Sequence, residues 1–95
     1  MIDAMTSPIG SEDYFADRLK DLRQRIVGKQ TCLSYAVGCT DAAVSFWESG
    51  KRLPHQGMIS RILLALADSG ASATELSSLL RTWQKAKGVR TARAA

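Results

Sequence analysis

Histidine is scarce in this chain of 95 residues, and long apolar runs are missing. His55 is the only histidine, and no obvious base or nucleophile stands beside it, so we do not expect an enzyme. The longest apolar run, Ile62 to Ala67, is far shorter than the ~20 residues of a membrane-spanning helix. Met1 to Gly10 lacks the basic and apolar regions of a secretion signal. We therefore expect a cytoplasmic protein without membrane contact.

Cysteine is also scarce, with Cys32 and Cys39 seven residues apart. A metal site would need more ligands than these two thiols, and His55 lies far away in the sequence. Because nothing suggests export, we expect two reduced thiols rather than a disulfide. The sequence predicts no metal and no other cofactor.

The net positive charge of the chain comes from its C-terminal segment, and the rest of the chain has no excess of basic residues. Up to Leu80 there are eight Lys/Arg against nine Asp/Glu, whereas the segment that follows has no acid. Its basic residues are Arg81, Lys85, Lys87, Arg90 and Arg93. Two interpretations stay open, namely a salt-sensitive attraction to phosphate groups and a solvated helix end with a frayed terminus.

Apolar residues recur at helical spacing in five segments, and no segment alternates with the period of a strand. Capping residues, prolines and glycines bound the expected helices. These run from Ser11 to Gly28, Gln30 to Val37, Asp41 to Trp47, Pro54 to Ala67, and Ser72 to Gly88. We therefore predict an all-α domain of five helices over residues 11–87. A flexible N-terminal arm at residues 1–10 and a basic flexible tail at residues 88–95 would flank it.

Gly38, Cys39 and Thr40 separate the second and third of these helices. A three-residue turn around a glycine is the geometry of a helix-turn-helix unit, because glycine accepts a positive φ without a Cβ clash. Thr40 is expected to cap the third helix. Such a unit places its second helix in the major groove of DNA while the first crosses the backbone.

Four sequence elements follow one another within the segment from Leu19 to Ala67. They are Leu19-x-x-Leu22-Arg23, Gln30-x-x-Leu33, Gly38, and Val44-Ser45-x-Trp47-Glu48-x-Gly50-Lys51-Arg52-x-Pro54. Together they resemble the lambda-repressor-like helix-turn-helix family, also called the Cro/repressor or xenobiotic-response-element type. The resemblance implies a five-helix DNA-binding domain.

The resemblance also implies roles for single residues. Gln30 would bond a phosphate and brace the recognition helix, and Arg23 and Glu48 would form an ion pair between the first and third helices. Phosphate contacts, which set register rather than sequence choice, would come from Lys29, Ser49, Lys51 and Arg52. An ordinary solvated loop is the alternative for the last two.

The base-reading positions depart from the family pattern. The remaining predicted DNA contacts are Thr40, Asp41, Ala42, Ser45 and Phe46. None of these side chains pairs bidentately with guanine or adenine, although Asp41 can accept from cytosine and Phe46 can touch a thymine methyl. A neighbouring loop that partly covers Phe46 is the alternative. We therefore expect few direct contacts with base edges, and we expect DNA shape and water bridges to supply the remaining specificity.

The C-terminal half carries more apolar side chains than one small core needs. The candidates for a dimer interface are Leu64, Leu76, Leu80 and Trp83. Packing of the fifth helix on its own domain is the other interpretation. The family resemblance favours the dimer, which would match palindromic half-sites.

The predicted function is a sequence-specific transcriptional regulator that binds double-stranded DNA, as a homodimeric repressor that occludes a promoter. An antitoxin-like or accessory module that acts mainly through a protein partner is the alternative. It is motivated by the poorly polar third helix, with Asp41 and Phe46 on its outer side.

Overall fold

In the computed structural model, the backbone is described from Tyr14 to Ala94 and the side chains from Tyr14 to Gly88. These residues form helices and no strand, which confirms the predicted all-α class. The elements are α2 (Phe15–Leu22), the π-helical turn η2 (Arg23–Val27), α3 (Gln30–Val37), α4 (Asp41–Glu48), α5 (Gln56–Asp68) and α6 (Ala73–Ala94). The predicted N-terminal arm and the predicted helix start at Ser11 lie outside the described residues.

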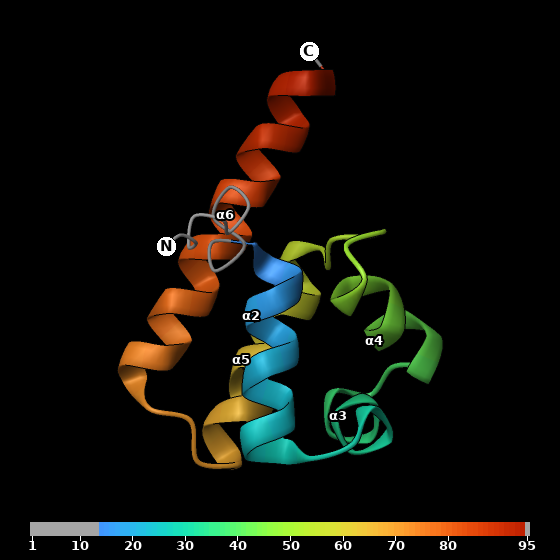
Figure 1. Cartoon of the computed structure of the whole chain (residues 1–95), viewed down its shortest axis with the longest axis vertical. Coiled ribbons are helices and arrows are strands. Elements are labelled where there is room, and N and C mark those ends of the chain that lie inside the picture. The colour runs from blue at the N-terminus through green and yellow to red at the C-terminus, as the bar shows by residue number, and fades with distance from the viewer. Residues whose placement is uncertain (1–13, 95) are drawn as a thin grey trace, which may run out of the picture.

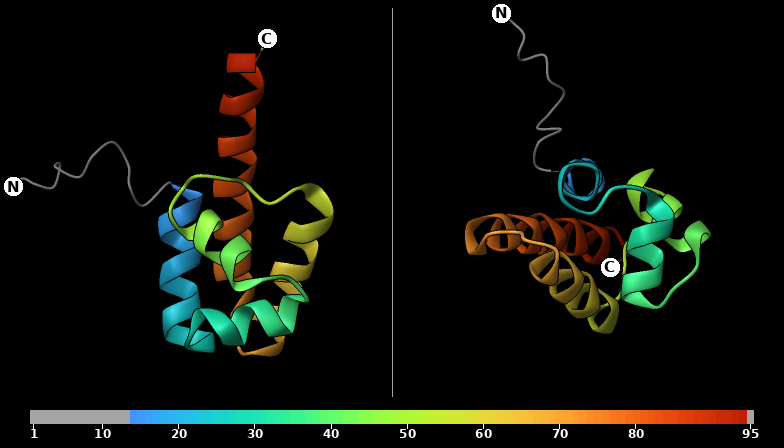
Figure 2. Two further views of the ribbon diagram at one scale, coloured as in Figure 1. Left: turned by 90° about the vertical axis from the view of Figure 1, so that its right-hand side faces the viewer. Right: turned by 90° about the horizontal axis from the view of Figure 1, so that it is seen from below.

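In the view of Figure 1, the α2 helix lies between α6 and the pair of α3 and α4. It packs against α4 on one side and α6 on the other, while α3 packs against α4 and α5. The views in Figure 2 place α3 and α4 together at one side of the molecule, away from most of α6. The two helices that the sequence predicts as a functional unit therefore lie side by side, on a face that α6 does not cover.

Apolar side chains of all five α-helices form one core. Their spacing of three and four residues puts them on one face of each helix, which turns inward. The buried members are Phe15, Leu19, Leu22, Leu33, Val37, Val44, Trp47, Ile59, Ile62, Ala65, Leu66, Leu79 and Trp83. The indole of Trp83 also donates from Nε1 to the carbonyl of Pro54 at 2.7 Å, which satisfies its buried polar atom.

The start of α5 differs slightly from the prediction. Pro54 was expected to open this helix, but the helix begins two residues later, at Gln56. His55 is its N-cap, and its Nδ1 accepts from the backbone N–H of Met58 at 3.2 Å. Pro54 is buried instead and holds Trp83 through its carbonyl.

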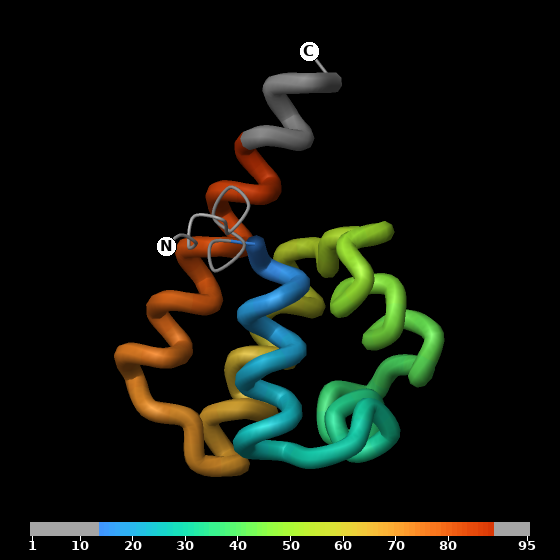
Figure 3. Tube along the Cα trace, in the orientation of Figure 1, coloured from blue at the N-terminus to red at the C-terminus, as the bar shows by residue number. Residues whose placement is uncertain are grey.

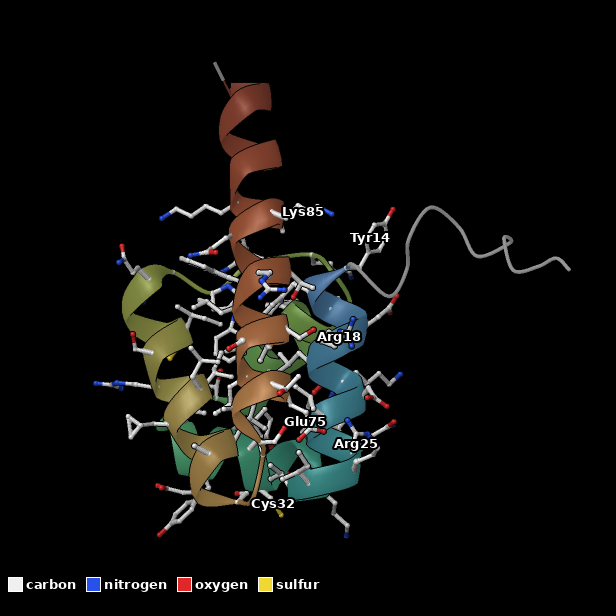
Figure 4. All side chains as sticks on the ribbon, turned by 90° about the vertical axis from the view of Figure 1, so that its left-hand side faces the viewer. Tyr14, Arg18, Arg25, Cys32, Glu75 and Lys85 are labelled. Carbon is white, nitrogen blue, oxygen red and sulfur yellow. The ribbon has the colours of Figure 1, made fainter. Side chains whose placement is uncertain are left out.

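A capping box opens α6, as the spacing of Ser72 and Glu75 predicts. The Glu75 N–H donates to Ser72 Oγ at 3.1 Å, and the Ser72 N–H donates to Glu75 Oε1 at 2.9 Å. Arg25 reaches across from η2 and donates to Glu75 Oε2 at 3.0 Å (Figure 4). This contact ties the start of α6 to the end of the first helical segment.

The predicted helix end at Gly88 is wrong, because α6 continues to Ala94. The tube in Figure 3 follows this helix up to Gly88, which is not among the glycines with positive φ. Glycine inside a helix costs only about 1 kcal/mol relative to alanine. The residues around it, among them Ala86, Lys87 and Ala92, favour the helix, so the single glycine does not end it.

Candidate nucleic-acid interface

The turn between α3 and α4 has the conformation that its sequence predicts. Gly38 is left-handed, with φ 85° and ψ 39°, and both its N–H and that of Cys39 donate to the carbonyl of Ser34, at 2.8 and 2.9 Å. Thr40 then caps α4, since its Oγ1 accepts from the N–H of Ala43 at 3.1 Å. A Cβ added at Gly38 would meet only an ordinary contact with Arg61, so the backbone conformation alone requires glycine.

Asp41 has a role in the structure that the sequence analysis did not foresee. Its carboxylate accepts hydrogen bonds from two α3 residues, at short range from the hydroxyl of Ser34 and at 3.4 Å from that of Thr31. The carboxylate also sits in the first turn of α4, where a negative charge is favourable. Asp41 therefore links the start of α4 to α3 through both of its carboxylate oxygens.

The ion pair expected between Arg23 and Glu48 is present. Arg23 donates from Nε and Nη2 to the two carboxylate oxygens of Glu48, at 2.8 and 2.7 Å. Only 9% of the Arg23 side chain and 3% of the Glu48 side chain is exposed. The hydrogen bond with Glu48 raises the pKa of Arg23 above its ordinary value, against the opposing effect of burial. This pair holds the last residue of α4 against the first helical segment.

Gln30 joins the same cluster. Its Nε2 donates to Glu48 Oε1 at 3.1 Å, from the first residue of α3. This hydrogen bond attaches the start of α3 to the last residue of α4. The end of α4 is thus attached to both of the helical segments that precede it.

The π-helical turn η2 is a feature that sequence reasoning missed. Its hydrogen bond runs from the N–H of Gly28 to the carbonyl of Arg23 at 2.7 Å, and the guanidinium of Arg23 donates back to the carbonyl of Gly28, also at 2.7 Å. Arg23 therefore closes the turn at both ends while it holds Glu48. Turns of this kind are often found at functional sites, and here the turn places the anchor of α4.

The outer side of α4 carries few hydrogen-bonding groups. Ala42 and Ser45 are exposed, and Phe46 is half-buried. The hydroxyl of Ser49 donates to the carbonyl of Phe46 at 3.2 Å. Lys29, Lys51 and Arg52 are exposed, Lys29 as the N-cap of α3 and the other two in the loop after α4. The structure thus brings the predicted contact residues together around α4, with the carboxylate of Asp41 also bonded to α3.

The loop after α4 folds back onto Phe46. The carbonyl of Phe46 accepts from the N–H groups of Lys51 and Arg52, at 3.0 and 3.3 Å, and Gly50 makes this possible with φ 80°. The guanidinium of Arg52 lies over the ring of Phe46, 5.1 Å from its centroid. Arg52 thus covers part of Phe46. The sequence signal would have been an aromatic side chain and an arginine six residues apart around a glycine turn.

The four residues proposed for a dimer interface do not form one exposed stripe. Trp83 is 5% exposed and donates a hydrogen bond to the carbonyl of Pro54, so it packs in the core of its own chain. Leu76 and Leu80 are half-buried against that core. Leu64, on α5, is 62% exposed.

The two cysteines are free thiols. Cys32 is exposed, and Cys39 is half-buried in the turn before α4. Burial, and then the charge of Asp41, raises the pKa of Cys39 above its ordinary value, which makes this thiol a poorer nucleophile.

Among the described residues, no group of His, Cys, Asp and Glu side chains could hold a metal ion. No helix in that part of the chain has the length and apolar character to cross a membrane. No family model matches the chain, and the curated proteins and the solved structures give no match either.

Proposed function

We propose that the protein is a sequence-specific DNA-binding transcriptional regulator of the lambda-repressor-like helix-turn-helix type, with α4 as its recognition helix. The observation that carries this proposal is the way α4 is held. Asp41 fixes its start to α3, and Glu48 fixes its end to Arg23 and Gln30. Both anchors leave the outer side of the helix open, as insertion into a major groove requires.

Cations on the flanks of α4 support the proposal. Lys29 precedes α3 and Lys51 follows α4, and both are exposed. Among the described residues, neither takes part in an ion pair. Positive side chains placed in this way contact phosphates and set the register of a protein on the duplex.

Binding of labelled duplexes, measured by fluorescence anisotropy at several salt concentrations, tests this function. The duplexes come from selection on a randomised library. Lys29→Gln and Lys51→Gln should each weaken binding to all sequences and flatten the salt dependence by about 0.9 units of logarithmic slope. Arg81→Gln is the matched control, because it removes one positive charge from α6, which packs on α2 and α5.

Two results would contradict the proposal. One is a selection that yields no duplex bound more tightly than random DNA. The other is a loss of affinity in Lys51→Gln that is no larger than in Arg81→Gln, since binding would then follow total charge rather than this face.

A homodimer that occludes a promoter is the form of regulator that we propose. Two-fold dimers match palindromic half-sites about one helical turn apart. Leu64 is an exposed large apolar side chain on α5, and Leu76 and Leu80 are half-buried on α6. Sedimentation equilibrium with and without a selected duplex gives the stoichiometry, and Leu64→Ser should weaken self-association. One protomer on one isolated half-site, with no second copy at higher concentration, would overturn the dimer.

A module that acts through a protein partner is the second candidate, and Tyr35 favours it. This tyrosine on α3 is 90% exposed, and tyrosine is enriched where proteins meet. If a partner covers α3, Tyr35→Ser should release a protein that co-purifies with the wild type from its native cell. A variant that keeps its partner but loses DNA affinity would favour the DNA-binding function instead.

A further inference from the structure

Sequence-specific regulators normally read guanine or adenine through two parallel hydrogen bonds from one side chain. The outer side of α4 offers Ala42, Ser45 and Phe46, and none of them has such a pair of donors. If the proposed DNA-binding function holds, the reader must come from elsewhere in the fold. The loop after α4 brings a guanidinium to this side of the helix.

Arg52 carries that guanidinium, and hydrogen bonds hold the backbone of its loop in place. The carbonyl of Phe46 accepts from the N–H groups of Lys51 and Arg52 and from the hydroxyl of Ser49. Three donors on one carbonyl, together with the positive φ of Gly50, fix the path of the chain back toward α4. The side chain of Arg52 therefore starts from a defined point beside the recognition helix.

The ring of Phe46 then directs the side chain. The Cζ atom of Arg52 lies 5.1 Å from the centroid of the ring. A guanidinium that lies over an aromatic ring keeps its N–H groups at its edge, where they can still donate. Among the described residues, no carboxylate forms an ion pair with Arg52. The donors are thus held in place by a contact that does not use them.

We propose that Arg52, held on the ring of Phe46, is the base-reading residue of this protein. It would donate two hydrogen bonds to O6 and N7 of a guanine in the major groove, and Phe46 would contact the methyl group of a neighbouring thymine. Phosphate contacts would be left to residues such as Lys51. The inference rests on the proposed function and assigns Arg52 to specificity rather than to general affinity.

The stacking contact explains how a residue in a loop reaches the precision of a residue on a helix. An arginine free in solvent loses much side-chain freedom when it binds, which lowers affinity. Here the ring restricts the guanidinium before DNA arrives. Arginine is also required, because the ammonium group of lysine presents no planar fork to the two acceptors of guanine.

The first experiment uses the wild-type protein and modified DNA. A half-site is selected from a randomised library, and we expect it to contain a guanine beside a thymine. Replacing that guanine with 7-deazaguanine removes the N7 acceptor, and replacing the thymine with uracil removes its methyl group. Each change should weaken binding, measured by anisotropy, while the same changes elsewhere in the duplex should have no effect.

The second experiment uses variants with conserved charge or apolar character. Arg52→Lys keeps the charge and should lower affinity for the selected site by about 5- to 150-fold, with loss of preference at the guanine position. Phe46→Leu keeps an apolar contact but removes the stacking ring, and should relax the same position. Lys51→Gln is the control, since it should weaken all duplexes alike. Circular dichroism checks that each variant is folded.

The outcomes separate this inference from the function on which it rests. If Arg52→Lys leaves every base preference unchanged, or if 7-deazaguanine has no effect, Arg52 is a phosphate contact and the inference is wrong, while DNA binding stands. A selected half-site without guanine overturns the inference in the same way. If selection yields no preferred sequence, the proposed function itself fails.

Discussion

Arg23 and Glu48 lie 25 residues apart in the sequence and are joined by two hydrogen bonds of 2.8 and 2.7 Å between their charged groups. Both side chains are almost fully enclosed. The pair connects the π-helical turn to the last residue of α4, and Gln30 adds a third partner. The position of α4 thus depends on a contact between distant parts of the chain.

Removing one member of this pair should destabilise the protein strongly. Glu48→Leu or Arg23→Met leaves the other charge enclosed without its partner, which we expect to lower the free energy of unfolding by about 3 kcal/mol or more. The double variant should be less destabilised than the sum of the single variants, because no lone charge remains. Urea unfolding gives these values. Strictly additive effects would mean that the two side chains are not coupled.

Glycine-to-alanine substitutions at Gly38 and Gly88 should change the stability of the protein in opposite directions. Gly38→Ala forces an L-residue into a left-handed conformation and should cost about 1 to 2 kcal/mol of stability. Gly88→Ala lies in a helix with free space around the added Cβ, and should stabilise the protein by about 0.5 to 1 kcal/mol. Thermal unfolding of both variants checks the signs. A Gly88→Ala variant without added stability would argue against a continuous α6.

Acid should weaken the protein in part through Glu75. The hydrogen bond from the backbone of Ser72, and next that from Arg25, lowers the pKa of Glu75 below its ordinary value of 4.5. A carboxylate with a lowered pKa adds stability that is present above its unfolded pKa and is lost as the pH falls through its folded pKa. The stability difference between the wild type and Glu75→Gln should therefore shrink as the pH falls below about 4.5.

Urea unfolding at a series of pH values between 7 and 3 measures this difference. Arg25→Gln is the control, because it keeps the larger contribution from Ser72 and should retain most of the pH dependence. A constant difference between the wild type and Glu75→Gln over the whole range would contradict the prediction.

Trp83 should stabilise the protein through contacts within its own chain. Trp83→Phe keeps most of the apolar volume but leaves the buried carbonyl of Pro54 without its donor, at a cost of about 1 to 3 kcal/mol. Because this contact lies inside one chain, the loss should be the same at every protein concentration. A stability loss that grows on dilution would instead indicate that Trp83 lies in a dimer interface. Thermal unfolding over a hundredfold range of protein concentration distinguishes the two outcomes.

The parts of the fold that sequence reasoning predicted correctly depend on neighbouring residues. The turn at Gly38, the cap at Thr40 and the capping box of Ser72 and Glu75 all act within one or two helical turns. Apolar spacing likewise predicted which face of each helix is buried. The ion pair of Arg23 and Glu48 was anticipated only through the family resemblance.

The features that sequence reasoning missed depend on contacts between different helices and loops. The π-helical turn is closed by Arg23, whose side chain is held by α4, so local propensity did not indicate it. The engagement of Asp41 needs α3 and α4 to lie side by side. The contact of Arg52 with the ring of Phe46 depends on the path of the loop after α4. In each case a tertiary contact decides which partner a polar side chain takes.

The side chains that hold α4 are not the side chains that face outward. Thr40, Asp41 and Glu48 anchor the helix, and Val44 and Trp47 fill the core. The outward positions are Ala42, Ser45 and Phe46, the last of which supports the loop through its main-chain carbonyl. Randomising these three positions should therefore give a library in which most members fold. Under the proposed DNA-binding function, such a division would let substitutions on the outer side of α4 alter DNA specificity while the scaffold stays the same.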